Sequence, residues 1–134
     1  MSVPSRRILV VDDAPDFLAF VDLLLTGEGY EILAVASADE ARAALAAALP
    51  HLVICDVRMP GSSPFAVLDM LRSDPVTATL PVLLCTGAVH DIEQAGERVA
   101  GPGIEVLFKP FDIDALFASI KRLMPEPIGD EHAR

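Results

Sequence analysis

The sequence predicts an α/β fold, namely a doubly wound, five-stranded parallel sheet with helices on both faces. Short, largely apolar runs of four to six residues recur along the chain, and amphipathic stretches with helical spacing lie between them. Strands that are apolar throughout are typical of a parallel sheet, because helices cover both of its faces. Five repeats of a strand followed by a helix favour right-handed crossovers.

The first half of the chain predicts three strands and two helices. The strands are expected over Ile8–Val11, Glu31–Ala36 and Leu52–Cys55. Pro15 suits the first turn of a helix, because that turn leaves its N–H groups unpaired in any case, and Gly29 can end the segment. The run Ser37-Ala38-Asp39-Glu40 has the capping-box pattern, so an alanine-rich helix is expected after Ser37.

The second half predicts two further strands and three helices. The strands are expected over Val82–Cys85 and Ile104–Phe108. Ser63 followed by Pro64 indicates an N-cap and a first helical position. Residues 89–100 predict a weaker helix. The clearest amphipathic stripe comes last, with Asp112 as its cap, and consists of Ile113, Leu116, Phe117 and Ile120.

A length of 134 residues favours one domain. Hydrophobic residues make up 52% of the chain, so neither disulfides nor a structural metal is needed to hold the fold together. We expect the domain to span residues 1–124. Residues 125–134 are polar and include two prolines and one glycine, which predicts a flexible C-terminal tail.

The formal net charge of −10 limits the classes of partner. An acidic surface repels nucleic acid and anionic membranes and favours basic partner surfaces, so no direct binding to nucleic acid is expected. The apolar run Ile8–Val11 is too short for a signal peptide or a membrane span. We therefore expect no membrane insertion and a cytoplasmic location.

Polar residues follow four of the five predicted strands. Asp12 and Asp13 follow the first strand, Asp56 the third, Thr86 the fourth and Lys109 the fifth. In open α/β sheets the ligand site lies beyond the carboxyl ends of the strands. Each of these residues alone fits an ordinary turn or cap, but their convergence at one edge of the sheet predicts a functional site.

The chemistry of this set favours phosphoryl transfer. Three crowded carboxylates repel one another and stay ionised cheaply only if a cation lies among them. Such a site suits Mg²⁺, which binds six ligands at about 2.0–2.1 Å and keeps some of its water. The Asp56 carboxylate can attack phosphorus to form an acyl phosphate, while Lys109 neutralises charge and the Thr86 hydroxyl donates a hydrogen bond.

Four short motifs resemble those of the receiver domains of two-component response regulators. They are Val10-Val11-Asp12-Asp13, Asp56-Val57-Arg58-Met59-Pro60-Gly61, Thr86-Gly87 and Lys109-Pro110-Phe111. Their order and spacing are specific, because Thr86 lies 30 residues after Asp56 and Lys109 lies 53 residues after it. The resemblance covers residues 6–124, nearly the whole chain.

The resemblance implies a flavodoxin-like fold of five βα units with strand order 2-1-3-4-5. It implies that Asp56 accepts the phosphoryl group and shares Mg²⁺ with the acidic pair Asp12 and Asp13. The backbone carbonyl of Arg58 would be a further metal ligand, which leaves its side chain free to vary. Lys109 would contact the phosphoryl group, and its peptide bond to Pro110 would be cis.

The resemblance also implies partners, and three departures bear on how the switch is read. The donor would be a histidine kinase or a histidine phosphotransfer protein, and a downstream protein target would read the result. Val106 stands where Tyr or Phe is common, which puts the usual aromatic readout in doubt. Gly87 replaces a commoner Ala and should leave the site more open. Pro64 replaces a usual Gly, so the loop after Asp56 is expected to take a different path.

The cysteines and histidines do not form a second site. Cys55 and Cys85 are not in a CxxC pair, so zinc is poorly supported. Strand alternation points both thiols into a core layer, and redox sensitivity between neighbouring strands is the alternative. His51, His90 and His132 are too scattered for a metal site or a phosphohistidine relay, and all three are expected at the surface.

The leading hypothesis is a phosphoacceptor switch, not an enzyme with a separate substrate. No output domain follows, so a single-domain regulator is expected, or else part of a longer one. A degenerate receiver that binds protein without phosphorylation is the alternative. A haloacid-dehalogenase-like phosphatase is the third hypothesis, but its nucleophile needs an Asp-x-Asp arrangement after the first strand. Ala14 occupies the place of the second Asp.

Overall fold

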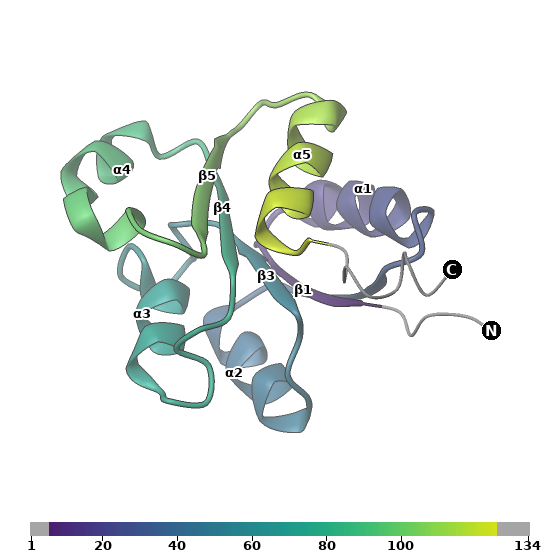
Figure 1. Ribbon diagram of the computed structural model, residues 1–134. Coiled ribbons are helices and arrows are strands. Elements are labelled where there is room, and N and C mark those ends of the chain that lie inside the picture. Colours follow the sequence, from purple (N-terminus) through teal and green to yellow (C-terminus); the bar gives the residue numbers. More distant parts are fainter. Residues whose placement is uncertain (1–5, 126–134) are drawn as a thin grey trace.

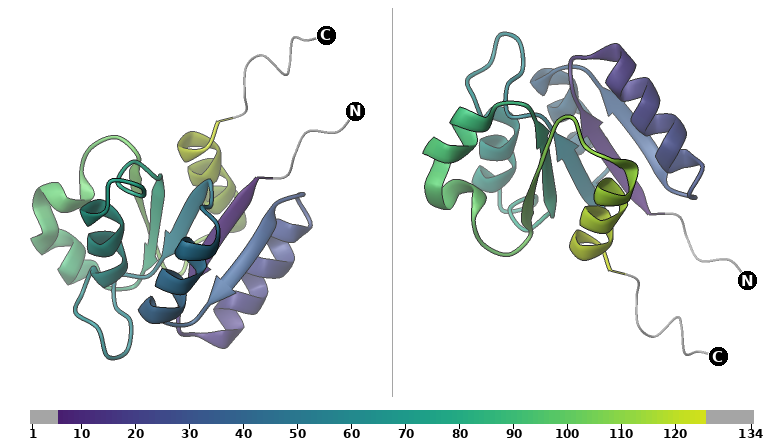
Figure 2. Two further views of the ribbon diagram at one scale, coloured as in Figure 1. Left: turned by 90° about the horizontal axis from the view of Figure 1, so that it is seen from below. Right: turned by 90° about the horizontal axis from the view of Figure 1, so that it is seen from above.

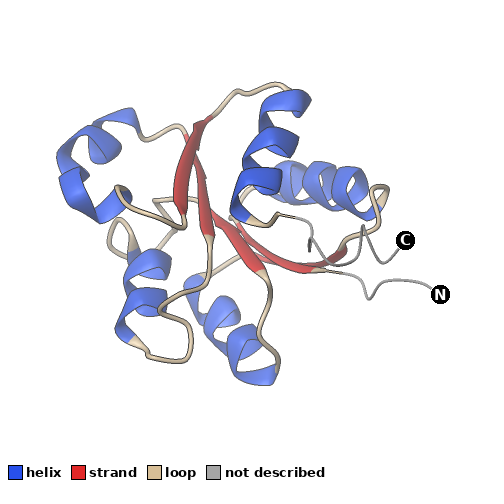
Figure 3. Ribbon diagram, viewed as in Figure 1, coloured by secondary structure: helices blue, strands red, loops and turns tan. Residues whose placement is uncertain are grey.

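Five strands alternate with five helices in the computed structural model, which describes residues 6–125 (Figure 1 and Figure 3). In chain order the elements are β1 (Arg7–Val11), α1 (Pro15–Thr26), β2 (Glu31–Val35), α2 (Ala38–Ala47), β3 (Leu52–Cys55), α3 (Ala66–Ser73), β4 (Val82–Thr86), α4 (Val89–Ala95), the 3₁₀ turn η1 (Gly96–Val99), β5 (Ile104–Phe108) and α5 (Ile113–Leu123). The tail predicted over residues 125–134 lies outside the described residues, apart from Pro125.

The strands form one parallel sheet in the order β2-β1-β3-β4-β5, which confirms the predicted fold and topology. Val11 pairs with Cys55 across β1 and β3, and Thr86 pairs with Phe108 across β4 and β5. The last residues of β1 and β3 are therefore level, as are those of β4 and β5, while β4 extends two residues beyond the end of β3. This register brings the turns after β1 and β3 side by side at the carboxyl edge of the sheet.

Helices cover both faces of the sheet (Figure 2). Leu9 and Val11 of β1 pack in a core with α2, α3 and α4, whereas Ile8 and Val10 pack in a second core with α1 and α5. Every residue of β3 and β4 is buried. Burial on both faces explains why these strands are apolar without alternation.

Hydrogen bonds confirm two of the predicted helix starts. Ser37 Oγ accepts from the N–H of Glu40 at 3.1 Å and so caps α2. The Glu40 carboxylate reaches back one residue beyond Ser37 and accepts from the N–H of Ala36 at 3.1 Å. Asp112 Oδ1 accepts from the N–H of Ala115 at 2.8 Å at the start of α5. The bonds to Ser37 Oγ and Asp112 Oδ1 each satisfy an N–H group that the first helical turn leaves unpaired.

The predicted start of the third helix at Ser63 and Pro64 is wrong, because α3 begins at Ala66. Phe65 precedes α3 in a left-handed conformation with φ of 67°, and it is only 4% exposed. The N–H of Phe65 donates to the carbonyl of Val57 at 2.8 Å, and Ser63 accepts from Ala66 at 3.1 Å. Burial of the ring and these bonds hold a turn that delays the helix.

The remaining boundaries differ by one residue or by a break. β1 begins one residue earlier than predicted, β2 ends at Val35 instead of Ala36, and β4 extends to Thr86. The helix predicted over residues 89–100 is divided into α4 and η1, because Gly96 has φ of 58° and interrupts the helical backbone. Among the described residues, no helix has both the length and the apolar character to span a membrane.

Candidate functional site at the carboxyl edge of the sheet

Lys109 joins the ends of four strands. Its Nζ donates to Asp12 Oδ2 at 2.6 Å and to Asp56 Oδ2 at 3.2 Å, which lie 97 and 53 residues away in the sequence. Its backbone N–H donates to the carbonyl of Thr86 at 2.9 Å, and its peptide bond to Pro110 is cis, as expected. The structure therefore brings together residues that the sequence predicted to share one edge of the sheet.

Asp12 is a buried carboxylate whose two oxygens are both engaged. Its side chain is 2% exposed, Oδ1 accepts from the N–H of Ala14 at 2.9 Å, and Oδ2 accepts from Lys109. Burying a carboxylate is costly unless it is paired and hydrogen-bonded, so Lys109 stabilises the charge at this position. Asp13, which the sequence placed in the same acidic pair, lies on the exposed side of the turn.

Asp56 is more accessible than Asp12, because 16% of its side chain is exposed. Its Oδ1 accepts from the N–H of Arg58 at 3.3 Å. Asp56 and Thr86 both line an open cleft of about 550 Å³, whose other residues are Arg58, Gly87, Ala88, Val89, His90 and Asp91. A carboxylate that is supported by a cation and opens into a cleft can act as a nucleophile toward a ligand there.

Thr86 contributes both its backbone and its hydroxyl. The residue is fully buried, and its Oγ1 accepts from the N–H of Ala88 at 3.1 Å. That bond uses a lone pair of the oxygen and leaves the hydroxyl proton to donate to another acceptor.

A larger cavity, of about 680 Å³, lies between α2 and α3 near Arg42 and Met70 and contains none of the predicted site residues.

The charge of Lys109 depends on its two carboxylate partners. Burial alone lowers the pKa of Lys109, but the hydrogen bond and charge of Asp12, followed by those of Asp56, outweigh burial and raise the pKa above its ordinary value. Because this folded-state pKa is raised, the ion pairs stabilise the fold fully below about pH 10.4 and lose that effect as pH rises further. Lys109 is therefore an ammonium at neutral pH.

The donor set fits Mg²⁺ with two side-chain ligands. Within residues 6–125, no three carboxylates, imidazoles or thiolates gather closely enough to hold one ion. Mg²⁺ commonly takes one or two carboxylates and keeps several waters, so the pair Asp12 and Asp56 is sufficient. Oxygens of both residues already face the same ammonium, which shows that a positive charge is favourable between them.

Arg58 has a side-chain role that the sequence did not reveal. Its Nε and Nη2 donate to the two carboxylate oxygens of Asp91, the latter at 3.0 Å, so the guanidinium ties the loop after Asp56 to α4. Hydrogen bonding to Asp91 raises the pKa of Arg58. The partners lie 33 residues apart, and neither stands in a local charge pattern, so only the tertiary structure shows the pair.

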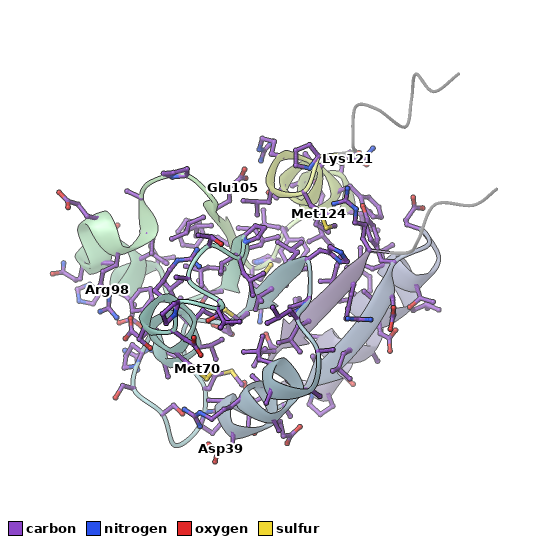
Figure 4. The ribbon with its side chains drawn as sticks, turned by 60° about the horizontal axis from the view of Figure 1, so that its bottom comes forward. Asp39, Met70, Arg98, Glu105, Lys121 and Met124 are labelled. Atoms are coloured by element: carbon purple, nitrogen blue, oxygen red, sulfur yellow. The ribbon has the colours of Figure 1, made fainter. Side chains whose placement is uncertain are left out.

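A second ion pair attaches the same region. Arg98 of η1, labelled in Figure 4, donates to both oxygens of Asp69 on α3 at 2.6 Å. Its guanidinium also lies over the Phe65 ring, 4.6 Å from the ring centroid. Neither α4 nor η1 contains a buried residue. Partly buried apolar residues of α4 and η1 pack against the core beside α3, and these charged contacts add to that packing.

The two thiols are packed away from the site, as predicted. Cys55 lies in the core beside α2 and α3, whereas Cys85 lies in the core beside α1 and α5, so they face opposite sides of the sheet. Burial raises the pKa of both thiols, to about 12 for Cys85, and keeps them protonated. His51 and His90 are exposed, as predicted, and His132 lies outside the described residues.

Comparison with known families agrees with this geometry. Residues 8–121 match the family model described as the response regulator receiver domain. The chain belongs to this family. Receiver domains are phosphoacceptor switches of two-component systems that histidine kinases phosphorylate in a reaction that depends on Mg²⁺, and they regulate downstream effectors.

Two curated relatives of this receiver domain are longer regulators. Response regulator PleD of Caulobacter vibrioides is 36% identical over 122 residues, which make up 89% of this chain and 26% of PleD. Transcriptional regulatory protein TcrA of Mycobacterium tuberculosis is 37% identical over 124 residues, or 90% of this chain and 47% of TcrA. The chain thus spans between a quarter and a half of the length of these relatives.

Solved structures share the fold over nearly their whole length. A putative response regulator from Chloroflexus aurantiacus has a TM-score of 0.80 and 31% identity, with 92% of this chain and 100% of that chain covered. Response regulator TrrA from Thermotoga maritima has a TM-score of 0.76 and 31% identity, with 88% and 98% covered, and was solved in complex with Mg²⁺ and BeF.

The structure shows the surroundings of Val106 and Gly87, two of the three residues that depart from the receiver pattern. Val106 is half-buried in β5 and packs against the core beside α3 and α4, so this position holds no aromatic ring that could turn. Gly87 lines the cleft, and a Cβ added there would meet no atom within 4 Å. The open entrance that the sequence predicted at Gly87 thus agrees with the local geometry.

Proposed function

We propose that this receiver domain accepts a phosphoryl group on Asp56 from a histidine kinase or histidine phosphotransfer protein, and that the modification changes its binding to a downstream protein. The observation that supports this most is the shared ammonium of Lys109, which contacts Asp12 and Asp56 together. A carboxylate so placed lies close to a cation, which favours its attack on phosphorus.

Asp56 and Asp12 would hold Mg²⁺ through their side chains, with Asp13 and the backbone carbonyl of Arg58 completing the set. When bound, the metal would neutralise charge on the transferring phosphoryl group. The exposed position of Asp13 suits a ligand that acts through metal-bound water. We propose Mg²⁺ as the metal because the site offers few oxygen ligands and the cleft is open to water, and Mg²⁺ keeps several waters when it binds.

In the transfer, an Asp56 carboxylate oxygen attacks phosphorus as the bond from phosphorus to the donor nitrogen breaks, and the donor imidazole leaves. Lys109 stays beside Asp56 and pairs with an oxygen of the phosphoryl group, while the Thr86 hydroxyl donates to another. Asp12 is unsuited to the nucleophilic role, because its side chain is 2% exposed and both oxygens are engaged. Its burial argues against the phosphatase hypothesis, in which the residue after the first strand attacks.

Beryllium fluoride, which mimics a phosphoryl group, tests this proposal without a partner. With Mg²⁺ and beryllium fluoride together, the thermal unfolding midpoint of the wild type should rise, because a ligand that binds only the folded state stabilises it. The Asp56→Asn variant and the metal-free wild type should show no such rise. An equal rise in Asp56→Asn would place the binding elsewhere, and no rise in the wild type would favour a degenerate receiver.

A further inference from the structure

The ammonium of Lys109 has three N–H donors, and two of them point to carboxylates. The Oδ2 atoms of Asp12 and Asp56 accept them at 2.6 Å and 3.2 Å. The Phe17 ring lies beside the same ammonium, with its centroid 4.2 Å from Nζ. At this distance the negative face of an aromatic ring attracts a cation, so Phe17 is a third partner of the charged group.

Phe17 is held by a second aromatic ring that follows the lysine in sequence. The rings of Phe17 and Phe111 lie 6.2 Å apart with an interplanar angle of 89°, an edge-to-face arrangement. Both side chains pack against the core beside α1 and α5. Lys109 and Phe111 therefore contact Phe17 from one short segment after β5, and α1 is the element that carries the ring to the site.

We propose that Phe17 is a positioning residue for phosphoryl transfer, whose ring holds the Lys109 ammonium against Asp12 and Asp56. A lysine side chain has four flexible methylene groups, so two carboxylate contacts alone leave its head able to turn toward solvent. The ring limits that freedom. A leucine at this position would fill similar space without attracting the charge. The inference rests on the proposed function, in which Lys109 contacts the phosphoryl group.

A fluorinated series separates attraction to the charge from packing. Replacement of Phe17 by mono-, di- and trifluorophenylalanine keeps a ring in place but weakens its negative face step by step. We expect the initial rate of phosphorylation by a small acyl-phosphate donor with Mg²⁺ to fall with each fluorine, by about three- to tenfold over the series. Phe17→Leu should resemble the trifluoro protein, and Phe17→Tyr should keep a rate near that of the wild type.

A second readout needs neither metal nor phosphodonor. Protons that lie over an aromatic face are shifted upfield in NMR spectra, so the ε-methylene protons of Lys109 should move downfield in Phe17→Leu. The matched control is Phe20→Leu, because Phe20 lies on the same helix, is 44% exposed and takes no part in the site. That variant should leave both the Lys109 shift and the phosphorylation rate unchanged.

The outcomes distinguish this inference from the function on which it rests. If wild type gains no phosphoryl group, the proposed function fails. If wild type is phosphorylated, but the fluorinated proteins react at one rate and the Lys109 shift is the same in Phe17→Leu, Phe17 serves packing alone and the inference is overturned. Thermal unfolding of each variant shows that the compared proteins are folded.

Discussion

Lys109 is the residue that makes the acidic site compatible with a stable fold. It compensates a buried carboxylate at Asp12 and a partly buried one at Asp56, and its own side chain is 25% exposed. An ammonium and a metal ion would occupy neighbouring space between the same oxygens. The stability of the site and its affinity for a cation are therefore coupled through one side chain.

Replacing Lys109 by Met tests that coupling. Removing the ammonium leaves Asp12 buried without its partner, so the free energy of unfolding at neutral pH should fall by about 1–3 kcal/mol. The affinity for Mg²⁺ should rise about fivefold or more, because a positive charge close to the ion is lost. Urea denaturation and calorimetric titration measure the two quantities. Unchanged Mg²⁺ affinity would show that the ion binds away from these carboxylates.

The buried thiol of Cys85 makes a prediction for alkaline pH. Burial raises its pKa from 9.0 to about 12, so between these values the unfolded thiol releases its proton while the folded one keeps it. In this range the folded state binds more protons than the unfolded state. The free energy of unfolding therefore falls as pH rises from 9.0 toward 12, and this thiol accounts for at most about 1.4 kcal/mol of the fall per pH unit. Urea denaturation across this range should show a shallower decline in Cys85→Ala. If stability fell equally steeply with pH in the wild type and in Cys85→Ala, the raised pKa of Cys85 would be refuted.

At the scale of elements, α4 and η1 are attached differently from the other helices. They bury no residue, and Arg58 and Arg98 tie them to the loop after Asp56 and to α3 through Asp91 and Asp69. Segments with few buried contacts open more readily than the rest of a domain. The backbone N–H of Arg58 also donates to Asp56 Oδ1 at 3.3 Å, so one residue links Asp56 to α4.

Arg58→Ala should loosen α4 without unfolding the domain. Arg58 is 64% exposed, so global stability should change by no more than about 1 kcal/mol, but amide hydrogen exchange in α4 should become faster. Arg42→Ala is the matched control, because Arg42 is 64% exposed and pairs with Asp39 on α2, away from the site. Exchange in α4 that is the same in both variants would mean that the ion pair does not hold the helix.

Local sequence patterns predicted most elements, and they failed where tertiary contacts determine the backbone. The caps at Ser37 and Asp112 each depend on a side-chain oxygen that accepts from the backbone N–H three residues later, a spacing that the sequence shows directly. Ser63 and Pro64 formed an equally good local pattern, yet the buried Phe65 ring holds a left-handed turn there. The break at Gly96 was missed because glycine within a helical pattern indicates no particular conformation.

For the whole molecule, topology explains why the site could be predicted. Parallel strands bring their carboxyl ends to one edge, so residues as distant as Asp12 and Lys109 could be assigned to one site without a structure. Sequence alone could not predict two other contacts, because they depend on how helices lie over that edge. These are the pairing of Arg58 with Asp91 and the contact of Phe17 with Lys109. The acidic surface follows from the net charge of −10 and suits a basic partner surface.

The most direct test of the account is the intact mass of the protein after incubation with Mg²⁺ and a small acyl-phosphate donor. The wild type should gain one phosphoryl group, and neither Asp56→Asn nor the metal-free wild type should gain any. A phosphoryl adduct that persists in Asp56→Asn, or a folded wild type that binds Mg²⁺ with beryllium fluoride yet never gains the phosphoryl mass, would contradict the assignment of Asp56 as the acceptor.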